Sequence, residues 1–361
     1  MEADEKERGG GLNHIIFSSG GTASLAVADW VKEQFPNDNI VMYFTDTLWE
    51  HPDCYRMLRE GSDKLQLPLL THSMGLNPIQ LMFEKKMVYN SMIGDCSKIL
   101  KMRVGMDFLK RGKLPAVAYW RNEQFLKDAD FKTDATLYFG IDFDEMHRET
   151  AITKNWAPFN VIFPLIENNI WKEEVLKKYD IEKPELYKLG FSHNNCHGRC
   201  VKAGQGHYKL LKEQLPDVFA KIMEQEFHLK MYVSAYRYIT KGNDPKDKTP
   251  IPDEDKIPLH VQEPMLKELD DAYRDYFYDR ALKPKLYVHP AGSAAVRYAK
   301  IQQYSFMKKD SQPYPIRQLN QDDEAERAMY GGAELIDRYD IGGCGCFTDS
   351  HCEIELEGVD V

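Results

Sequence analysis

Short apolar runs alternate with stretches of helical spacing along the first half of the chain. The apolar runs are rich in β-branched and aromatic residues and predict strands over residues 14–17, 39–44, 68–72, 136–141 and 159–166. Between them, apolar residues recur at helical spacing, in residues 25–31, 52–66, 94–113 and 169–178. A regular alternation of strands and helices predicts an α/β fold with a doubly wound, mostly parallel sheet.

The turn between the first strand and the first helix contains two glycines and four hydroxyl residues. Gly20 and Gly21 allow backbone angles that let several N–H groups face one anion, and the helix that follows adds partial positive charge. No lysine follows at the Walker position, and an ordinary β-to-α turn is the alternative interpretation. The candidate phosphate-binding residues are Ser18, Ser19, Gly20, Gly21, Thr22 and Ser24.

Asp46 and Thr47 follow the second predicted strand. Ligands of open α/β sheets bind at the carboxyl ends of the strands, so a carboxylate here is suited to a ribose, a metal ion or an adenine edge. A helix cap or a turn residue is an equally good explanation of Asp46 from the local sequence.

The second half of the chain is more helical and carries a basic segment. Residues 208–229 predict two helices broken at Pro216, a Pro-rich loop follows over 241–258, and a long helix is predicted over 263–280. In residues 281–318, seven lysines and arginines stand against one acid, interleaved with tyrosines and a phenylalanine. This mixture suits a polynucleotide strand, although a solvated basic face over core aromatics is the alternative.

The length and charge of the chain argue against several classes of protein. The chain has 361 residues and a formal net charge of -10, which argues against non-specific coating of nucleic acid. It has no apolar run of about 18 residues that would cross a membrane. Residues 1–11 are charged and are expected to be flexible rather than a secretory signal, so we expect a cytoplasmic protein. The predicted domains are 12–190, which binds nucleotide, and 191–361, which contains clustered cysteines.

Seven cysteines in a chain of this kind favour metal ligation over disulfides. Cys196 and Cys200 lie among three histidines, and soft and borderline ligands at this density indicate a metal site. Cys344 and Cys346 form a second pair. Cys96 precedes a predicted helix, where the positive helix end favours a thiolate, with a buried structural cysteine as the alternative.

Several motifs occur in one known order. They are the S-S-G-G-T-A-S loop, the F-T-D-T strand end, Cys96 before Lys101, G-I-D-F-D-E-M-H-R at residues 140–148 and the segment from P-L-I-E-N-N to F-S-H-N-N-C at residues 164–196. Together they resemble the phosphoadenosine phosphosulfate reductase family of the PP-loop, or N-type ATP pyrophosphatase, superfamily. The resemblance covers roughly residues 12–205.

The resemblance implies a Rossmann-like PP-loop fold and a site for ATP or phosphoadenosine phosphosulfate. The loop would grip phosphate, Asp46 and Thr47 would border the nucleotide, and Lys101 and Arg148 would be the catalytic, anion-contacting residues. It also implies a four-iron, four-sulfur cluster, for which zinc is the alternative. The candidate metal ligands are Cys96, Cys196, Cys200, Cys344 and Cys346.

The chain departs from the family at positions that matter for chemistry. Ala23 stands where pyrophosphatase members carry an acid that helps to hold magnesium, Asp142 replaces a common basic residue, and the reductase tail with its nucleophilic cysteine is missing. The favoured function is ATP-dependent adenylation coupled to sulfur transfer onto a nucleic acid, through residues 281–318, or onto another acceptor. Sulfonucleotide reduction and a non-catalytic nucleotide sensor with a structural metal are the alternatives. The sequence leaves open whether the chain forms a homo-oligomer.

Overall fold

The computed structural model describes residues 12–90, 94–241, 256–290, 292 and 304–330. The chain divides into two compact units. In the described residues, the first unit comprises 12–76 and 95–198, and the second comprises 77–94 and 199–330. The second unit thus includes a segment, residues 77–94, that lies within the predicted nucleotide-binding domain.

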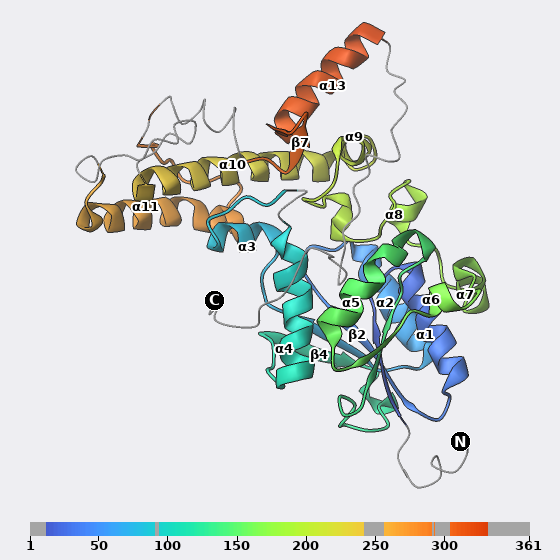
Figure 1. The fold of residues 1–361 in the computed structure, drawn as a ribbon. Helices are drawn as coiled ribbons and strands as arrows, with labels where there is room; N and C mark the ends of the chain where they lie inside the picture. The colour runs from blue at the N-terminus through green and yellow to red at the C-terminus, as the bar shows by residue number, and fades with distance from the viewer. Residues whose placement is uncertain (1–11, 91–93, 242–255, 291, 293–303, 331–361) are drawn as a thin grey trace. The chain divides into compact units, whose positions relative to one another are not determined.

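The first unit contains a β-sheet (Figure 1). Its six strands run in the order β4-β3-β2-β1-β5-β6. The strands are β1 (Asn13–Phe17), β2 (Asn39–Thr45), β3 (Leu69–Ser73), β4 (Val117–Arg121), β5 (Thr136–Phe139) and β6 (Asn160–Ile162). All neighbouring pairs are parallel except β3 with β4, which is antiparallel. The predicted α/β class and mostly parallel sheet are confirmed.

Alternating residues of the central strands pack into two separate apolar clusters, one on each face of the sheet. Ile16 and Met42 belong to the cluster formed with α1 (Thr22–Gln34), α2 (Pro52–Leu65) and α7 (Lys172–Lys178). Ile15 and Val41 belong to the cluster formed with α4 (Val104–Arg111) and α5 (Glu149–Trp156). Successive side chains of a strand point to opposite faces, which is why continuous apolar runs form these buried strands.

The remaining helical segments of the first unit are short. They are a π-helix η1 (Ser97–Arg103), 3-10 helices η2 (Glu123–Phe125), η3 (Phe143–Arg148) and η4 (Cys196–Gly198), α6 (Pro164–Glu167) and α8 (Glu185–Lys188). The single helix predicted over 94–113 is therefore a π-helical turn followed by α4. The strand predicted over 159–166 was too long, because Pro164 begins α6 and proline favours the first position of a helix.

The second unit is mainly helical. Its elements are α3 (Pro78–Glu84), α9 (Gln205–Gln214), α10 (Pro216–Lys241), α11 (Leu259–Phe277), the hairpin β7 (Met307–Lys309) and β8 (Gln312–Tyr314), and α13 (Ile316–Tyr330). The predicted break at Pro216 is confirmed, and α10 and α11 lie side by side (Figure 1). Phe83, Tyr232 and Phe277 form an aromatic cluster within this unit.

The aromatic residues of the basic segment 281–318 are mostly part of the core. Tyr304, Phe306 and Tyr314 are each at most 5% exposed, so these three rings are not available as a stacking surface in this structure. Tyr298 lies outside the described residues. No helix in the described part of the chain is long and apolar enough to cross a membrane.

Candidate functional site

The loop between β1 and α1 is shaped by close contact with α2. Gly20 has a φ of +72°, and a Cβ added there would lie 2.3 Å from the Cys54 Sγ and 3.0 Å from the Cys54 carbonyl oxygen. A residue with a side chain at this position would therefore be strained in the left-handed backbone conformation, and its Cβ would also clash with α2. The backbone freedom predicted for both glycines is thus needed at Gly20, whereas Gly21 has an extended backbone that other residues adopt.

The hydroxyl of Ser24 fastens the loop to the first turn of the helix. It accepts from the Ser19 N–H at 3.2 Å and donates to the Gly21 carbonyl at 3.1 Å. Gly21 is the N-cap of α1, and it brings no side chain that would cap the helix. The positive end of a 13-residue helix therefore lies beside the loop, as an anion site requires.

A pocket of about 110 Å³ opens at this loop. The loop lines it together with Gly140 and Ile141, which follow β5, and with the helical segment that carries Glu145 and Arg148. Tyr187 and residues 193–195 complete the lining. The loop and Arg148 are thus brought together at the carboxyl end of the parallel strands, where the sequence placed them.

Polar side chains give this pocket its chemistry. Arg148 donates to the Glu145 carboxylate at 2.5 Å, with side chains 16% and 28% exposed. His193 has a lowered pKa, chiefly because of burial, which the Glu145 charge opposes. The Asn194 amide nitrogen donates to the Gly20 carbonyl at 2.8 Å, whereas its buried Oδ1 has no hydrogen-bond partner in the described chain. Among the described residues, the lining of the pocket thus includes the Arg148 guanidinium, the Glu145 carboxylate, the neutral His193 imidazole and the Asn194 Oδ1 without a hydrogen-bond partner.

Tyr187 lies close to the loop at Gly21. Its hydroxyl oxygen lies 3.0 Å from the position that a Cβ on Gly21 would take. Burial raises the pKa of Tyr187, and hydrogen bonds from Thr22 and from the Asn194 backbone oppose that rise. The phenol oxygen thus lies beside the part of the loop that would hold a phosphate oxygen.

Asp46 and Thr47 lie in a second, buried cluster at the end of β2. Asp46 accepts from the Tyr55 hydroxyl and from the Leu48 N–H, both at 2.8 Å. Burial is the largest influence on the Asp46 carboxyl and raises its pKa, although these two hydrogen bonds oppose the rise. Leu48 follows Asp46 by two residues, so its contact fits the turn interpretation of Asp46, whereas Tyr55 contacts Asp46 from α2.

Glu50 is the centre of this second cluster, and sequence reasoning did not select it. Its side chain is fully buried and accepts from the Thr47 hydroxyl at 2.9 Å and from the Cys196 N–H at 2.5 Å. The Lys101 ammonium lies 3.3 Å from the same carboxylate and is itself 4% exposed. In the sequence, Glu50 is an acid three residues after the polar end of a predicted strand. Many surface turns have the same pattern, so the sequence did not distinguish it.

Lys101 is paired with Glu50 in this second, buried cluster. Within the described chain, the residues that line the pocket at the loop do not include Lys101, Asp46 or Thr47. The buried ion pair with Glu50 gives Lys101 a structural role, and its catalytic role stays a prediction.

The predicted metal ligands are only partly described. Cys96 and Cys196 in the first unit and Cys200 in the second are each buried. Among the described residues, no group of three or more His, Cys, Asp and Glu side chains is arranged to hold a metal ion. Cys344 and Cys346 lie outside the described residues, so the metal site stays a prediction.

Each histidine near these cysteines has its own surroundings within its unit. His197 packs its ring edge against His51 at 4.6 Å between ring centroids, while His193 lines the pocket at the loop. His207 is buried in α9 of the second unit.

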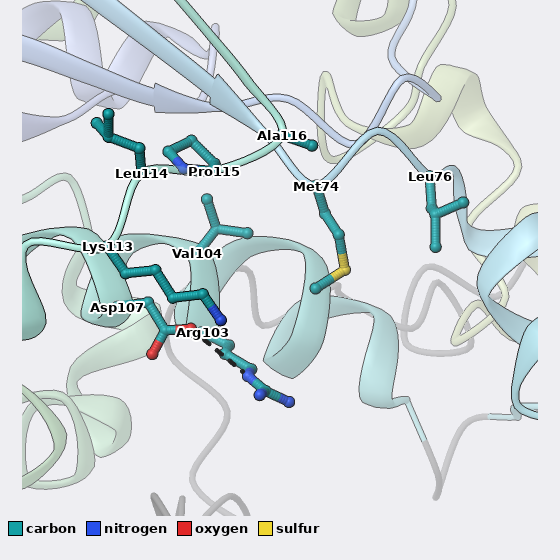
Figure 2. A pocket seen from close by; sticks show the side chains of 9 residues that line it. All are labelled: Met74, Leu76, Arg103, Val104, Asp107, Lys113, Leu114, Pro115 and Ala116. Atoms are coloured by element: carbon teal, nitrogen blue, oxygen red, sulfur yellow. Dashed lines mark ion pairs between the residues drawn. The ribbon is translucent and has the colours of Figure 1, made fainter. Parts of the chain in front are cut away.

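A larger pocket of about 350 Å³ lies elsewhere in the first unit (Figure 2). Met74 and Leu76 follow β3 on one side, and Arg103 and Asp107 lie opposite with 3.7 Å between their charged atoms. Leu114 and its neighbours close one end. None of the predicted site residues lines this pocket.

Comparison with known proteins adds no relative. No protein-family model matches the chain, and neither a curated protein nor a solved structure matches it. The functional interpretation consequently depends on the residues and on their geometry.

Proposed function

We propose that the pocket at the loop binds the phosphates of an adenine nucleotide, and that the chain is a PP-loop enzyme with a doubly wound, Rossmann-like first unit. One observation carries the proposal. The glycine loop, the positive end of α1 and the Arg148 guanidinium converge on a single cavity. This combination of backbone donors and one guanidinium is the usual recognition set for phosphate.

The size of the pocket indicates which part of the nucleotide it takes. Cavities that enclose a whole ligand measure about 300–1,000 Å³, whereas this one measures about 110 Å³. It is therefore suited to phosphate groups, with the ribose and base outside it. The unused Oδ1 of Asn194 would accept a hydrogen bond from a ligand hydroxyl or amine.

We further propose that the reaction is ATP-dependent adenylation followed by sulfur transfer. An acceptor oxygen attacks the α-phosphorus of ATP, the bond to pyrophosphate breaks, and an adenylate forms. A sulfur nucleophile then displaces AMP from the activated carbon, which receives sulfur in place of oxygen. The adenylate turns a poor oxygen leaving group into a good one, which is the reason for using ATP.

The residues of the pocket suit the first of these steps. Arg148 would neutralise charge on the phosphates, and its ion pair with Glu145 holds it in place before the nucleotide binds. His193 has a lowered pKa and is therefore neutral at pH 7, so it is able to accept the proton of an attacking hydroxyl.

Magnesium would need a carboxylate that the loop itself lacks, because Ala23 stands at the expected position. Among the described residues that line the pocket, Glu145 is the one carboxylate, and carboxylate oxygen is a ligand that magnesium prefers. Glu145 is therefore our candidate for this role.

A cluster on Cys96, Cys196 and Cys200, completed by Cys344 or Cys346, would carry the incoming sulfide, and residues 281–318 would hold a nucleic-acid acceptor. Among the described residues, no three such ligands are arranged to hold a metal ion. We therefore assign no residue a role in a step at the cluster. Zinc in place of iron would instead favour a structural site.

Product analysis tests the reaction. Anaerobically purified protein is assayed for its metal and then incubated with ATP or with phosphoadenosine phosphosulfate. We expect AMP and pyrophosphate from ATP in the presence of an acceptor, and iron rather than zinc in the protein. Release of sulfite from phosphoadenosine phosphosulfate would replace this proposal by the reductase. Nucleotide binding without any product would favour the non-catalytic sensor.

A further inference from the structure

The second unit has a pocket of its own, at the junction of α10 with the first turns of α13. Its volume is about 340 Å³, which lies within the range of about 300–1,000 Å³ that is usual for ligand sites. Glu226, Phe227 and Lys230 line it from α10, and Arg317 and Gln321 are among the residues that line it from α13. All of these residues belong to the second unit.

Lys230 is the unusual residue of this pocket. The whole residue is 2% exposed, so its ammonium group does not extend into bulk water. In the part of the chain that the structure describes, this ammonium has neither a hydrogen-bond acceptor nor an ion-pair partner. A buried ammonium without a partner costs several kcal/mol, so an acceptor is expected in the space beside it.

Glu226 lies one helical turn before Lys230 but is occupied elsewhere. One carboxylate oxygen accepts from the Phe306 N–H at 2.8 Å, and the other accepts from the Ile316 N–H at 2.7 Å. These two residues flank the hairpin of β7 and β8, so Glu226 fastens both ends of the hairpin to α10. The carboxylate is thus explained by the fold, whereas the ammonium of Lys230 is not.

The other polar groups of the pocket are mainly donors. The Arg317 guanidinium lies 3.8 Å from the centre of the Phe227 ring and donates to Glu224 at 2.5 Å, which holds it at the rim. Gln318 and Gln321 are exposed and present carboxamide groups from α13. The start of this 15-residue helix adds partial positive charge.

Burial lowers the pKa of Lys230, the Glu226 charge opposes this effect, and the Arg317 charge adds to it. An anion in the pocket would stabilise the charged form of Lys230 and would raise its pKa, because the anion would lie near both Lys230 and Arg317.

We propose that this pocket is a second anion site, which binds a small molecule through a phosphate or carboxylate group held by Lys230, with Arg317 and the α13 amides at the rim. The binding needs no residue of the loop at residues 18–24. Separate titrations with a phosphate and with a carboxylate distinguish the two possible oxyanions.

Calorimetric titration of the full-length protein with inorganic phosphate and, separately, with succinate tests the proposal. We perform it in the Gly21→Val background, which removes the loop site. Lys230→Met keeps the length of the side chain and removes the charge, so affinity should fall at least tenfold, as expected for the loss of a charge-assisted contact. The titrant that shows this loss identifies the oxyanion.

An exposed variant keeps the test decisive if Lys230→Met does not fold. Gln321→Glu adds a negative charge at the rim and should weaken binding of the same anion at least threefold. Gln312→Glu is the matched control, because it adds the same charge on an exposed position of β8 that does not line the pocket. Absence of binding by both titrants, or equal affinity in the Gln321→Glu and Gln312→Glu proteins, would overturn the proposal.

Discussion

Replacement of Lys101 by methionine is expected to lower the free energy of unfolding by about 3–5 kcal/mol. Methionine approximates the shape of the lysine stem but leaves the fully buried Glu50 carboxylate without its cation. The hydrogen bonds from Thr47 and Cys196 remain, yet they do not replace a full positive charge. Since whole domains are stable by about 5–15 kcal/mol, this loss should be plain in chemical denaturation.

The same experiment separates the charge from the packing. Adding Glu50→Gln to the Lys101→Met protein removes the stranded charge and should restore much of the lost stability. Lys188→Met is the matched control, because Lys188 pairs with Glu182 at an exposed surface and such pairs contribute about 0–1 kcal/mol. Equal effects of Lys101→Met and Lys188→Met would contradict the account of this ion pair.

Replacement of Arg148 by methionine is expected to weaken ATP binding about tenfold to a hundredfold, because charge-assisted hydrogen bonds contribute about 1.5–3 kcal/mol each. The guanidinium lines the pocket at the loop and is 16% exposed, so it can reach a phosphate without rearrangement of the backbone. Affinity for adenosine, which has no phosphate, should stay unchanged. Equilibrium titration with both ligands measures the difference.

Arg111→Met provides the control for a general loss of positive charge. Arg111 is 42% exposed and also pairs with an acid on its own helix, Asp107, but it does not line the pocket. ATP affinity should therefore be the same in this variant as in the unchanged protein. An equal loss of ATP affinity in the Arg111 and Arg148 variants would show that Arg148 has no specific role.

The buried part of the fold was accessible from the sequence, because buried strands need continuous apolar runs and the runs at β1, β2, β3 and β5 are short and separated by helical spacing. The edge strand β4 was not predicted, although its sequence V-A-Y-W-R is mostly apolar and aromatic; its first three residues are exposed, as an edge strand allows. Pattern reasoning also merged η1 with α4, because the two follow each other without a break and π-helical turns occur within longer helices.

The site was accessible to a smaller extent. Glycines and hydroxyl residues after a strand predicted the loop, and strand ends predicted that Arg148 would lie near it. Glu50 was missed because nothing in a local sequence distinguishes a buried carboxylate from a surface one. Its partner Lys101 comes from an element about 50 residues later in the chain, so only the folded structure reveals the pair.

The second unit shows the limit of composition. The basic and aromatic residues of 281–318 suggested a stacking surface, but Phe306 and Tyr314 are buried around the β7–β8 hairpin. Composition cannot tell a core ring from an exposed ring, because both occur beside lysines whose stems cover apolar surface. Lys230 was missed for the same reason, since it lies in a helix with many other charged residues.

The most direct test of the central claim is the affinity of the Gly21→Val protein for ATP. Gly21 has an extended backbone that valine can adopt, but a Cβ there lies 3.0 Å from the Tyr187 hydroxyl and 3.4 Å from the Ser19 Oγ, and the methyl groups would fill the pocket. We expect ATP affinity to fall at least a hundredfold in a variant that still unfolds cooperatively in chemical denaturation. ATP affinity equal to that of the unchanged protein would show that the loop is not the nucleotide site.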